Sequence, residues 1–456
     1  MPSPPRDDVT HLPPSRGSSV PDVLTAARSE QQQRRVAGTL TAHGLVAGDR
    51  LVLAVPGSPT YVSVVLGALR SGIVPVPLDP RLTAHERDAI IADVAPSLVV
   101  DDDADLESLL SGPDAVLSPH PRCRPMHFTS GTTGRPKGVW SGMLSPEHAA
   151  ALVAEERDLW GFASDDLDLV VSPIYHSAPL RFAMGTILAG GSVAVLPRFE
   201  PDAFLSAVAD LRPTSMFCVP AHLQRLFAHL DERGLTPDVS SFRLVAHAGA
   251  PCPEPVRLRA HALFGTDVVW EFYGSTEGQF TACSAPEWAE RPGTLGLARP
   301  GRVVTTDDEG QLWCSVPAWA RFTYWNAPEK TAQTWRTTPD GPAFTVGDLG
   351  RVDDDGYVFL DSRREDLIIT GGVNVYPAEV EAALQTVDGV DDVAVYGRDD
   401  ERWGQRVCAA YVGDVDEAVL RAVAEERLAP PKRPKTYVRH AELPRTATGK
   451  VRRTQL

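Results

Sequence analysis

Strand-like and helix-like segments alternate along most of this 456-residue chain, and that alternation restricts its fold more than any other feature. Near the start, the apolar runs at 50–55, 73–79 and 97–103 are typical of buried strands. A helix begins between the last two, marked by Thr83 with Glu86 three residues later, the spacing of a capping box. Further strand-like runs lie at 167–173, 192–197, 215–220 and 242–250. Strands that alternate with helices through short loops predict βαβ units and a mainly parallel sheet in an α/β fold.

The pattern changes after about residue 295, where short strands and turns replace the βαβ units. The stretch 362–456 mixes strands and helices and predicts a small α+β domain. The charged junction 361–366 has the composition of an exposed linker, so we expect a hinge between this domain and a large N-terminal body at 24–361. Residues 1–23 contain six prolines and no apolar stretch of a signal peptide, so we expect a disordered tail there.

Charge and cysteine spacing exclude several functions. Lys and Arg number 44 against 60 Asp and Glu, so the net charge is −16 and the overall field repels nucleic acid and anionic membranes. The longest apolar stretches fall short of the ~20 residues that a bilayer span needs. Six cysteines lie far apart without a C-x-x-C pair, which excludes a zinc ribbon or a dithiol redox site. We therefore expect a cytoplasmic protein that binds no nucleic acid and does not insert into membranes.

The strongest chemical signal is the loop FTSGTTGRPKG at 128–138. Its glycines give backbone freedom, its hydroxyl side chains supply donors and Lys137 adds a point charge, a combination that suits a polyphosphate. It is not a Walker loop, because Pro136 precedes Lys137 and no Ser or Thr follows it. A flexible polar loop without a ligand is the alternative. The candidate phosphate-binding residues are Thr129, Ser130, Gly131, Thr132, Thr133 and Gly134.

With this loop the chain resembles the adenylate-forming (AMP-binding) enzymes, which include acyl- and aryl-CoA ligases, peptide-synthetase adenylation domains and luciferases. Their TSGTTGxPKG signature is matched at every fixed position, and the resemblance extends from about residue 45 to the C-terminus. The segments PIYHSAPLRFA and YGSTEGQFT look most like those of bacterial fatty-acid- and aryl-CoA ligases. The further motifs, in the family's order, are AGAP (248–251), YGSTE (273–277), TVGD (345–348), GGVNVYP (371–377) and PRTATGK (444–450).

The resemblance implies the ligands of the nucleotide. Lys137 and Lys450 would offset phosphate charge, and Lys450 would pair with both the carboxylate and the α-phosphate. Thr129 and Glu277 would hold Mg²⁺ against the phosphates, since this hard cation prefers oxygen ligands. Asp348 would accept hydrogen bonds from both ribose hydroxyls. The other nucleotide-binding positions that it implies are Gly249, Ala250, Pro251, Tyr273, Gly274, Thr276 and Arg363.

The resemblance also implies a mobile small domain. Relatives rotate it between two half-reactions, and the pivot position is Glu365 here, where Asp or Lys is the usual residue. The rotation would remove Lys450 and bring in Gly371 and Gly372, which border the pantetheine tunnel in relatives. The expected partner molecules are therefore ATP, Mg²⁺, a small aromatic or fatty acid, and the thiol of CoA or of phosphopantetheine on an acyl carrier protein.

The acid pocket is expected around Tyr175 and His176, where relatives place an aromatic or His gate. His176 would orient the substrate carboxylate, and a buried structural histidine is the alternative. Arg181 follows close behind, and a cation beside an acyl pocket is costly unless an anion pairs with it. The hypothesis is a substrate with a second acidic or hydroxyl group; the alternative is an arginine that points to solvent.

Three functions follow from the motifs. The first is adenylation of an acid with release of pyrophosphate, followed by transfer to a thiol. The second is an ATP-dependent diazotase that adenylates nitrite and diazotises an aromatic amine in natural-product biosynthesis. The third is a non-catalytic nucleotide-binding protein, against which stands the retention of the charged residues at all the motif positions.

Overall fold

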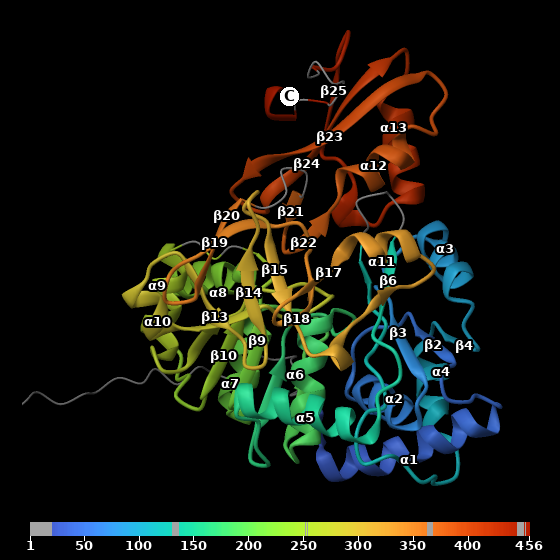
Figure 1. Cartoon of the computed structure of the whole chain (residues 1–456), viewed down its shortest axis with the longest axis vertical. Helices are drawn as coiled ribbons and strands as arrows, with labels where there is room; N and C mark the ends of the chain where they lie inside the picture. The colour runs from blue at the N-terminus through green and yellow to red at the C-terminus, as the bar shows by residue number, and fades with distance from the viewer. Residues whose placement is uncertain are drawn as a thin grey trace, which may run out of the picture.

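A large body carries a small domain at one end, drawn in orange and red at the top of Figure 1. This computed structural model describes residues 21–129, 136–250, 252, 254–362, 368–444, 451 and 453–456. The predicted α/β fold, with a large N-terminal body and a small C-terminal α+β domain, is confirmed.

Three parallel strands open the body, with β2 (Arg50–Leu53) between β3 (Val74–Pro77) and β4 (Leu98–Val100). Local sequence sets the limits of the helices around them: Thr83 and Glu86 form the predicted capping box, and Gly72 ends α2 in the left-handed region at φ 82°. These helices are α1 (Ala26–Ala42), α2 (Pro59–Ser71), α3 (Ala84–Val94) and α4 (Asp103–Ser108), followed by the 3₁₀ turn η1 (Leu109–Ser111).

The largest sheet has ten strands, five of them parallel at its centre. The parallel strands are, in spatial order, β8 (Ser192–Val195), β7 (Leu167–Val170), β9 (Ser215–Cys218), β10 (Leu244–His247) and β11 (Val269–Glu271). Beyond β11 the antiparallel strands β12 (Thr281–Ser284), β13 (Thr294–Ala298), β20 (Tyr357–Ser362) and β19 (Leu349–Val352) extend the sheet. The flanking helices are α5 (Pro146–Trp160), α6 (Ser177–Leu188), α7 (Pro201–Leu211), α8 (Pro220–Arg233), α9 (Glu254–Phe264) and α10 (Ala285–Glu290).

The other edge of this sheet was not predicted. Strand β1 (Val23–Thr25) pairs antiparallel with β8, so Val23, the last residue of the expected tail, lies opposite Ala194 in the sheet. Three residues without an apolar run give no periodic signal, which is why the sequence does not reveal this strand. Residues 1–20 of the expected tail lie outside the described residues.

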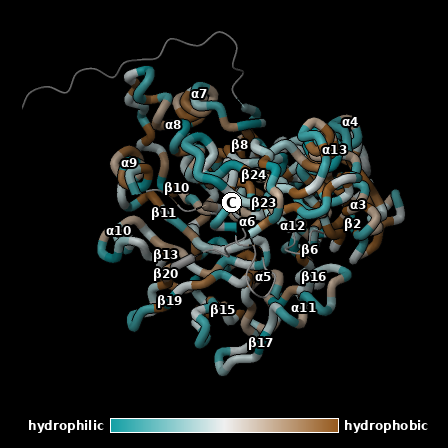
Figure 2. The backbone as a smooth tube through the Cα atoms, turned by 90° about the horizontal axis from the view of Figure 1, so that it is seen from above, coloured by the Kyte–Doolittle hydropathy of each residue, from teal (hydrophilic) through white to brown (hydrophobic). Residues whose placement is uncertain are grey.

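Two smaller sheets complete the body. One contains β14 (Val303–Thr306), β15 (Leu312–Ser315), β18 (Gly341–Phe344) and β17 (Trp335–Thr338); the other contains β16 (Thr323–Tyr324), β6 (Lys137–Trp140) and β5 (Phe128–Thr129). The remaining short helices are η2 (Ala318–Ala320) and α11 (Pro328–Thr334). In Figure 2 much of the tube along the outer loops of these regions is teal, the colour of hydrophilic residues. This is expected for a body whose apolar strands are buried. None of the described helices combines the length and apolarity that a bilayer span requires.

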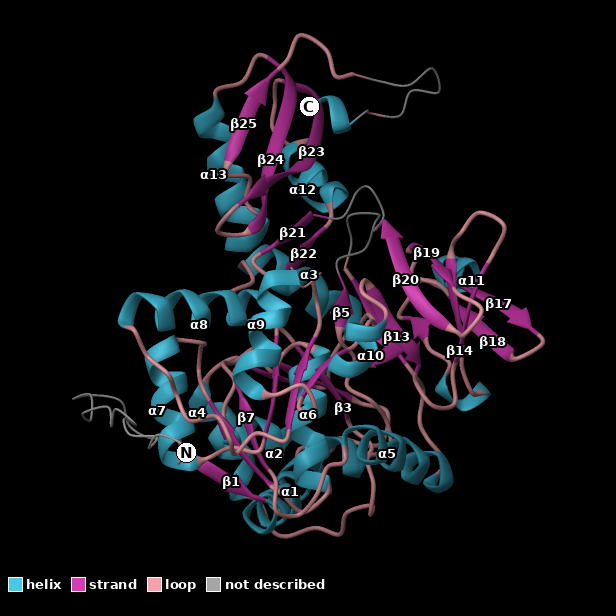
Figure 3. Cartoon of the chain, turned by 90° about the vertical axis from the view of Figure 1, so that its left-hand side faces the viewer, coloured by secondary structure: helices cyan, strands magenta, loops and turns pink. Residues whose placement is uncertain are grey.

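The small domain has its own sheet and its own core. Its strands run in the order β22 (Val373–Val375), β21 (Ile368–Thr370), β24 (Gly404–Gly413) and β23 (Val390–Asp400), and β25 (Thr436–Arg439) pairs with β24. Helices α12 (Pro377–Leu384) and α13 (Glu417–Arg427) and the turns η3 (Pro430–Lys432) and η4 (Arg453–Gln455) complete it. Figure 3 shows this unit standing apart from the body except at its lower end, where α13 packs on α3.

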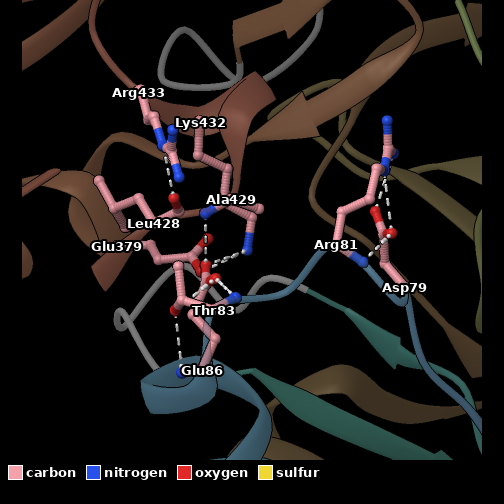
Figure 4. Close-up of polar contacts among 9 residues, drawn as sticks. All are labelled: Asp79, Arg81, Thr83, Glu86, Glu379, Leu428, Ala429, Lys432 and Arg433. Atoms are coloured by element: carbon pink, nitrogen blue, oxygen red, sulfur yellow. Dashed lines mark hydrogen bonds and ion pairs between the residues drawn. The ribbon is translucent and has the colours of Figure 1, made fainter. Parts of the chain in front are cut away.

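A buried ion cluster joins the two parts (Figure 4). The ammonium group of Lys432 lies 2.6 Å from a carboxylate oxygen of Glu379 in the small domain and 3.3 Å from Oε1 of Glu86 in the body. The backbone N–H of Ala429 also donates to this Oε1, at 3.1 Å. The Lys432 side chain is only 13% exposed and those of Glu86 and Glu379 only 7%. Although burial disfavours the charged form, the two carboxylates raise the pKa of Lys432 above its usual value, so the cation persists.

We expect the Lys432→Met substitution to loosen this docked arrangement. It leaves two buried carboxylates without their cation, which costs about 3–5 kcal/mol in a buried pair. Small-angle X-ray scattering should show a larger radius of gyration, and limited proteolysis should cut faster between the two parts. The matched control is Lys435→Met, because Lys435 is exposed and, among the described residues, its ammonium group bonds only the Pro430 carbonyl oxygen, at 3.3 Å. Scattering and cleavage that match the unaltered protein in both variants would contradict this role of Lys432.

Candidate active site

A cleft of about 990 Å³ lies between the two parts of the chain. Its floor is formed where the central parallel strands end: Ser172 follows β7, Val219 follows β9, Gly249 follows β10 and Phe272 follows β11. Its other wall comes from the small domain, including the turn between β21 and β22. The carboxyl edge of a parallel sheet is where α/β proteins place their ligands, because loops from several strands meet there.

The structure brings most of the sequence-predicted residues to this one cleft. The predicted residues that line it are Thr129, Lys137, Tyr175, His176, Arg181, Gly249, Gly274, Thr276, Glu277, Asp348, Gly371 and Gly372. Ala250 and Tyr273 are described but do not line it. The predicted residues that lie outside the described part of the chain are Ser130, Gly131, Thr132, Thr133, Gly134, Pro251, Arg363, Glu365 and Lys450.

Two of the carboxylates that line the cleft, Asp348 and Glu277, are each held by a tyrosine hydroxyl. The hydroxyl of Tyr273 donates to Asp348 at 2.6 Å, and the hydroxyl of Tyr324 donates to Glu277 at 2.7 Å. A hydrogen bond to a charged group is roughly twice as strong as a neutral one, so both carboxylates are fixed in direction. Tyr273 was predicted to contact the nucleotide; it is 5% exposed and supports Asp348 instead of lining the cleft. Tyr324 was not singled out in the sequence, because no motif places it beside Glu277.

The gate histidine is exposed to the cleft and neutral. His176 precedes the first turn of α6, and its ring lies 4.6 Å from that of Tyr175. Desolvation by the surrounding protein lowers the pKa of its imidazole, and the alternative of a buried structural histidine is wrong. Tyr175 is held in turn, since its hydroxyl accepts a hydrogen bond from Arg81 at 2.7 Å. Arg81 also pairs with Asp79 at 2.8 Å. Neither Asp79 nor Arg81 was predicted, although both line the cleft. A neutral imidazole at this place can donate or accept one hydrogen bond without adding charge.

The inner end of the cleft is aromatic and contains the predicted arginine. Phe217 and Phe272 line it, with ring centroids 5.6 Å apart. The guanidinium of Arg181 lies 5.2 Å from the Phe272 ring centroid, within reach of a cation–π interaction, and its Nε lies 3.5 Å from a carboxylate oxygen of Glu156. The alternative in which Arg181 points to solvent is therefore wrong, because its side chain is only 21% exposed and pairs with a buried carboxylate.

The glycine turn of the small domain inserts into the cleft. Gly371 and Gly372 have φ of 57° and 81°, in the left-handed region that favours glycine. A Cβ atom on Gly372 would lie 3.5 Å from the side chain of Val219 in the body, so the turn approaches the end of β9 closely. In this pose the small domain presents its glycine turn to the cleft, as the resemblance implies for the second half-reaction.

Family models and curated relatives agree on one family. A model described as AMP-binding enzyme matches residues 20–122 and 122–317, and one described as AMP-binding enzyme C-terminal domain matches residues 379–450. A feruloyl-CoA synthase of an Amycolatopsis species is 35% identical, with 94% of this chain and 92% of the relative covered. A long-chain-fatty-acid–CoA ligase of Mycobacterium tuberculosis is 32% identical, with 95% and 92% covered.

Solved structures match both parts of the chain. The o-succinylbenzoate CoA synthetase of Bacillus subtilis, bound with its product analogue OSB-NCoA, superposes with a TM-score of 0.82 at 25% identity, covering 94% of this chain and 92% of that chain. ATP-bound MatB of Rhodopseudomonas palustris gives a TM-score of only 0.64 at 31% identity, with the same shares covered. Because both structures align over 94% of this chain, the body and the small domain both share their fold with these neighbours. By its family models, its relatives and its fold, the chain belongs to the AMP-binding, adenylate-forming enzymes.

Proposed function

We propose that the protein is an ATP-dependent acid–thiol ligase that works in two half-reactions. In the first, a carboxylate oxygen of a small acid bonds to the α-phosphorus of ATP while the bond from that phosphorus to the bridging oxygen of the β-phosphate breaks. The products are an acyl-adenylate and pyrophosphate. In the second, a thiol sulfur bonds to the acyl carbon, AMP leaves with the electron pair of the broken C–O bond, and the thiol proton is released. The observation that carries the proposal is the convergence of Lys137, Glu277, Asp348 and the Gly371–Gly372 turn on one cleft.

Different residues of the cleft are proposed to bind the ribose, the phosphates and the acid in the first half-reaction. Asp348, aligned by Tyr273, is the acceptor for the ribose hydroxyls, and Lys137 offsets phosphate charge. His176 holds the acid's carboxylate through a neutral hydrogen bond. The site holds the carboxylate in line with the α-phosphate, which reduces the entropic cost of bringing the two reactants together. In phosphoryl transfer this positioning, together with stabilisation of charge, supplies nearly all of the catalysis. Arg363 and Lys450 are assigned here by resemblance alone.

The oxygen donors of the cleft fit Mg²⁺. This ion binds one or two carboxylates and completes its shell with water and phosphate oxygens, and Glu277 with Thr129 offers that kind of set. Among the described residues there is no group of three or more His, Cys, Asp or Glu that could hold a metal alone, which agrees with an ion held largely by phosphates. When bound, Mg²⁺ would neutralise charge on the phosphates.

The acceptor in the second step is proposed to be CoA or the phosphopantetheine of an acyl carrier protein. The support is the pose of the small domain, which presents the glycine turn to the cleft and superposes well on a structure holding a CoA product analogue. Glu365 is proposed as the pivot of the rotation that exchanges this pose for the adenylating one.

A pyrophosphate-release screen tests the proposal. The purified protein with ATP and Mg²⁺ is offered aromatic, fatty and inorganic acids, each with and without CoA, and AMP and thioester are measured. We expect pyrophosphate with at least one organic acid and a thioester when CoA is added. Turnover only with nitrite and an aminobenzoate would assign the diazotase reaction instead. No pyrophosphate with any acid, despite bound ATP, would leave a nucleotide-binding protein.

Glu277→Gln should impair the first half-reaction. It removes the carboxylate proposed to hold Mg²⁺ and should lower the rate of ATP–pyrophosphate exchange on the order of 100-fold, the size typical for loss of one charge-stabilising group. Raising the Mg²⁺ concentration should recover part of that loss. Glu290→Gln, at an exposed position of α10, is the matched control and should exchange at the normal rate. Full activity of Glu277→Gln at low Mg²⁺ would contradict this assignment.

The ion cluster at Lys432 should affect the two half-reactions unequally. If the described pose serves thiol transfer, Lys432→Met should slow single-turnover thioester formation from preformed adenylate at least fivefold. ATP–pyrophosphate exchange should change less than twofold, because it uses the other pose. Lys435→Met again serves as the control. Equal losses in both half-reactions would show that the cluster does not favour the transfer pose.

A further inference from the structure

A second cavity of about 140 Å³ lies behind the aromatic end of the cleft. The two cavities share lining residues at Ser177, Arg181 and the segment 275–277, so they are neighbours across the Arg181 side chain. Four arginines line this second space, which is here called the arginine chamber: Arg124, Arg181, Arg299 and Arg302. They come from separate parts of the chain, so no motif in the sequence marks them.

The chamber has more guanidinium groups than carboxylates to pair with them. Of the glutamates of α5, Glu156 lines it and bonds Arg299 at 2.8 Å. Its neighbour Glu155 does not line the cavity but bonds Arg302 at 3.0 Å. The Arg299 and Arg302 side chains are each only 5% exposed. Burial alone would raise the pKa of Glu156, but the guanidinium groups of Arg181 and Arg299 lower it to about 2, so the carboxylate is charged.

Three of the four arginines lack a full set of hydrogen-bond partners among the described residues, because Nη2 of Arg299 also has none. Arg181 only approaches Glu156, at 3.5 Å, and its Nε has no hydrogen-bond acceptor in the described structure. Arg124 forms neither an ion pair nor a side-chain hydrogen bond with any described residue. Burial, together with the positive charges of Arg302 and Arg299, lowers the pKa of Arg124 to about 10, which still leaves it charged at neutral pH.

The remaining titratable groups of the chamber do not neutralise its excess positive charge. His127 lines the chamber, but burial lowers its pKa to about 4 and it is neutral. Glu277 lies at the boundary with the cleft, where Tyr324 already bonds it. The cavity lining therefore has four arginines and two carboxylates, and Glu155 behind Arg302 brings the nearby anions to three. The rest of the lining is largely apolar, including Leu69, Leu152, Met184 and Phe344, so the charges lie in a medium that strengthens electrostatic interactions.

We propose that the arginine chamber binds a compact oxyanion, with Arg124 as its principal ligand. Arg124 is only partly buried, but a guanidinium that lines a largely apolar cavity without a partner is still costly. A carboxylate or phosphate group satisfies it by accepting hydrogen bonds from its paired N–H donors. The volume is several times the ~30 Å³ share of one water molecule, so a single anionic group fits. Two sources share this chemistry: the second carboxylate of an acid substrate that reaches past Arg181, and a free inorganic anion.

The first experiment compares matched acids and rests on the proposed function. Benzoate with terephthalate, and hexanoate with adipate, are used as substrates for pyrophosphate release by the unaltered protein and by Arg124→Met. If the substrate supplies the anion, the unaltered protein prefers the diacid of a pair, and Arg124→Met reduces that preference in kcat/KM by about tenfold or more. Turnover of the monoacid should be unaffected, and Arg122→Met, at the exposed neighbouring arginine, should preserve the preference.

The second experiment needs no turnover, so it remains informative if the proposed function fails. Binding of inorganic phosphate and of terephthalate is measured by calorimetry without nucleotide. Saturable binding of phosphate that Arg124→Met abolishes, with unchanged acid preference, assigns the chamber to a free anion. Without added anion, Arg124→Met should melt at the same temperature as the unaltered protein or higher, because it removes an unpaired, partly buried charge.

The proposal is overturned if Arg124→Met alters neither diacid preference nor anion binding. It is equally overturned if this variant melts lower without anion, since Arg124 would then support the fold. Should Arg124→Met not fold, Arg124→Gln keeps a polar side chain at the site and is judged by the same two measurements.

Discussion

The small domain completes the cleft, and a charge cluster that is hidden from water links it to the body. Lys432 and Glu379 belong to one part and Glu86 to the other, so the attraction acts across the boundary. A buried ion pair gains little over apolar packing, but breaking it is costly because the charges that remain lose both water and partner. Such a contact therefore favours one position of the small domain relative to the body over positions that leave these charges unpaired.

The residues around the cleft divide into those that face a ligand and those that support them. Asp348 and Glu277 face the open space, and Tyr273 and Tyr324 hold them from behind. His176 lines the cleft, while Arg81 fixes the tyrosine beside it. Supporting side chains of this kind limit the freedom of the groups that act, so the geometry is prepared before substrates arrive.

The sequence predicted the elements and the cleft residues well, because both leave local signals. Alternating apolar runs and the Thr83–Glu86 cap mark the βαβ units, and glycine-rich motifs mark the nucleotide loops. It did not predict β1, which is too short to show a period, or the partners of the motif residues. Tyr324 lies 47 residues from Glu277, and Glu86 lies 346 residues from Lys432. Contacts at such separations depend on the tertiary fold, and no spacing rule reports them. The arginine chamber was missed for the same reason, although Arg181 alone hinted at it.

Glu86 uses its two carboxylate oxygens for different purposes. Oε2 accepts from the backbone N–H and the hydroxyl of Thr83 and so closes the start of α3, whereas Oε1 faces Ala429 and Lys432. Contacts within the body therefore orient Oε1 by themselves, so the proposed rotation of the small domain would return to an acceptor that needs no rearrangement. For protein engineering, this makes position 86 a poor choice for tuning the rate of that proposed rotation. Any replacement there would damage a helix start and a domain junction together, whereas the partner cation can be changed alone.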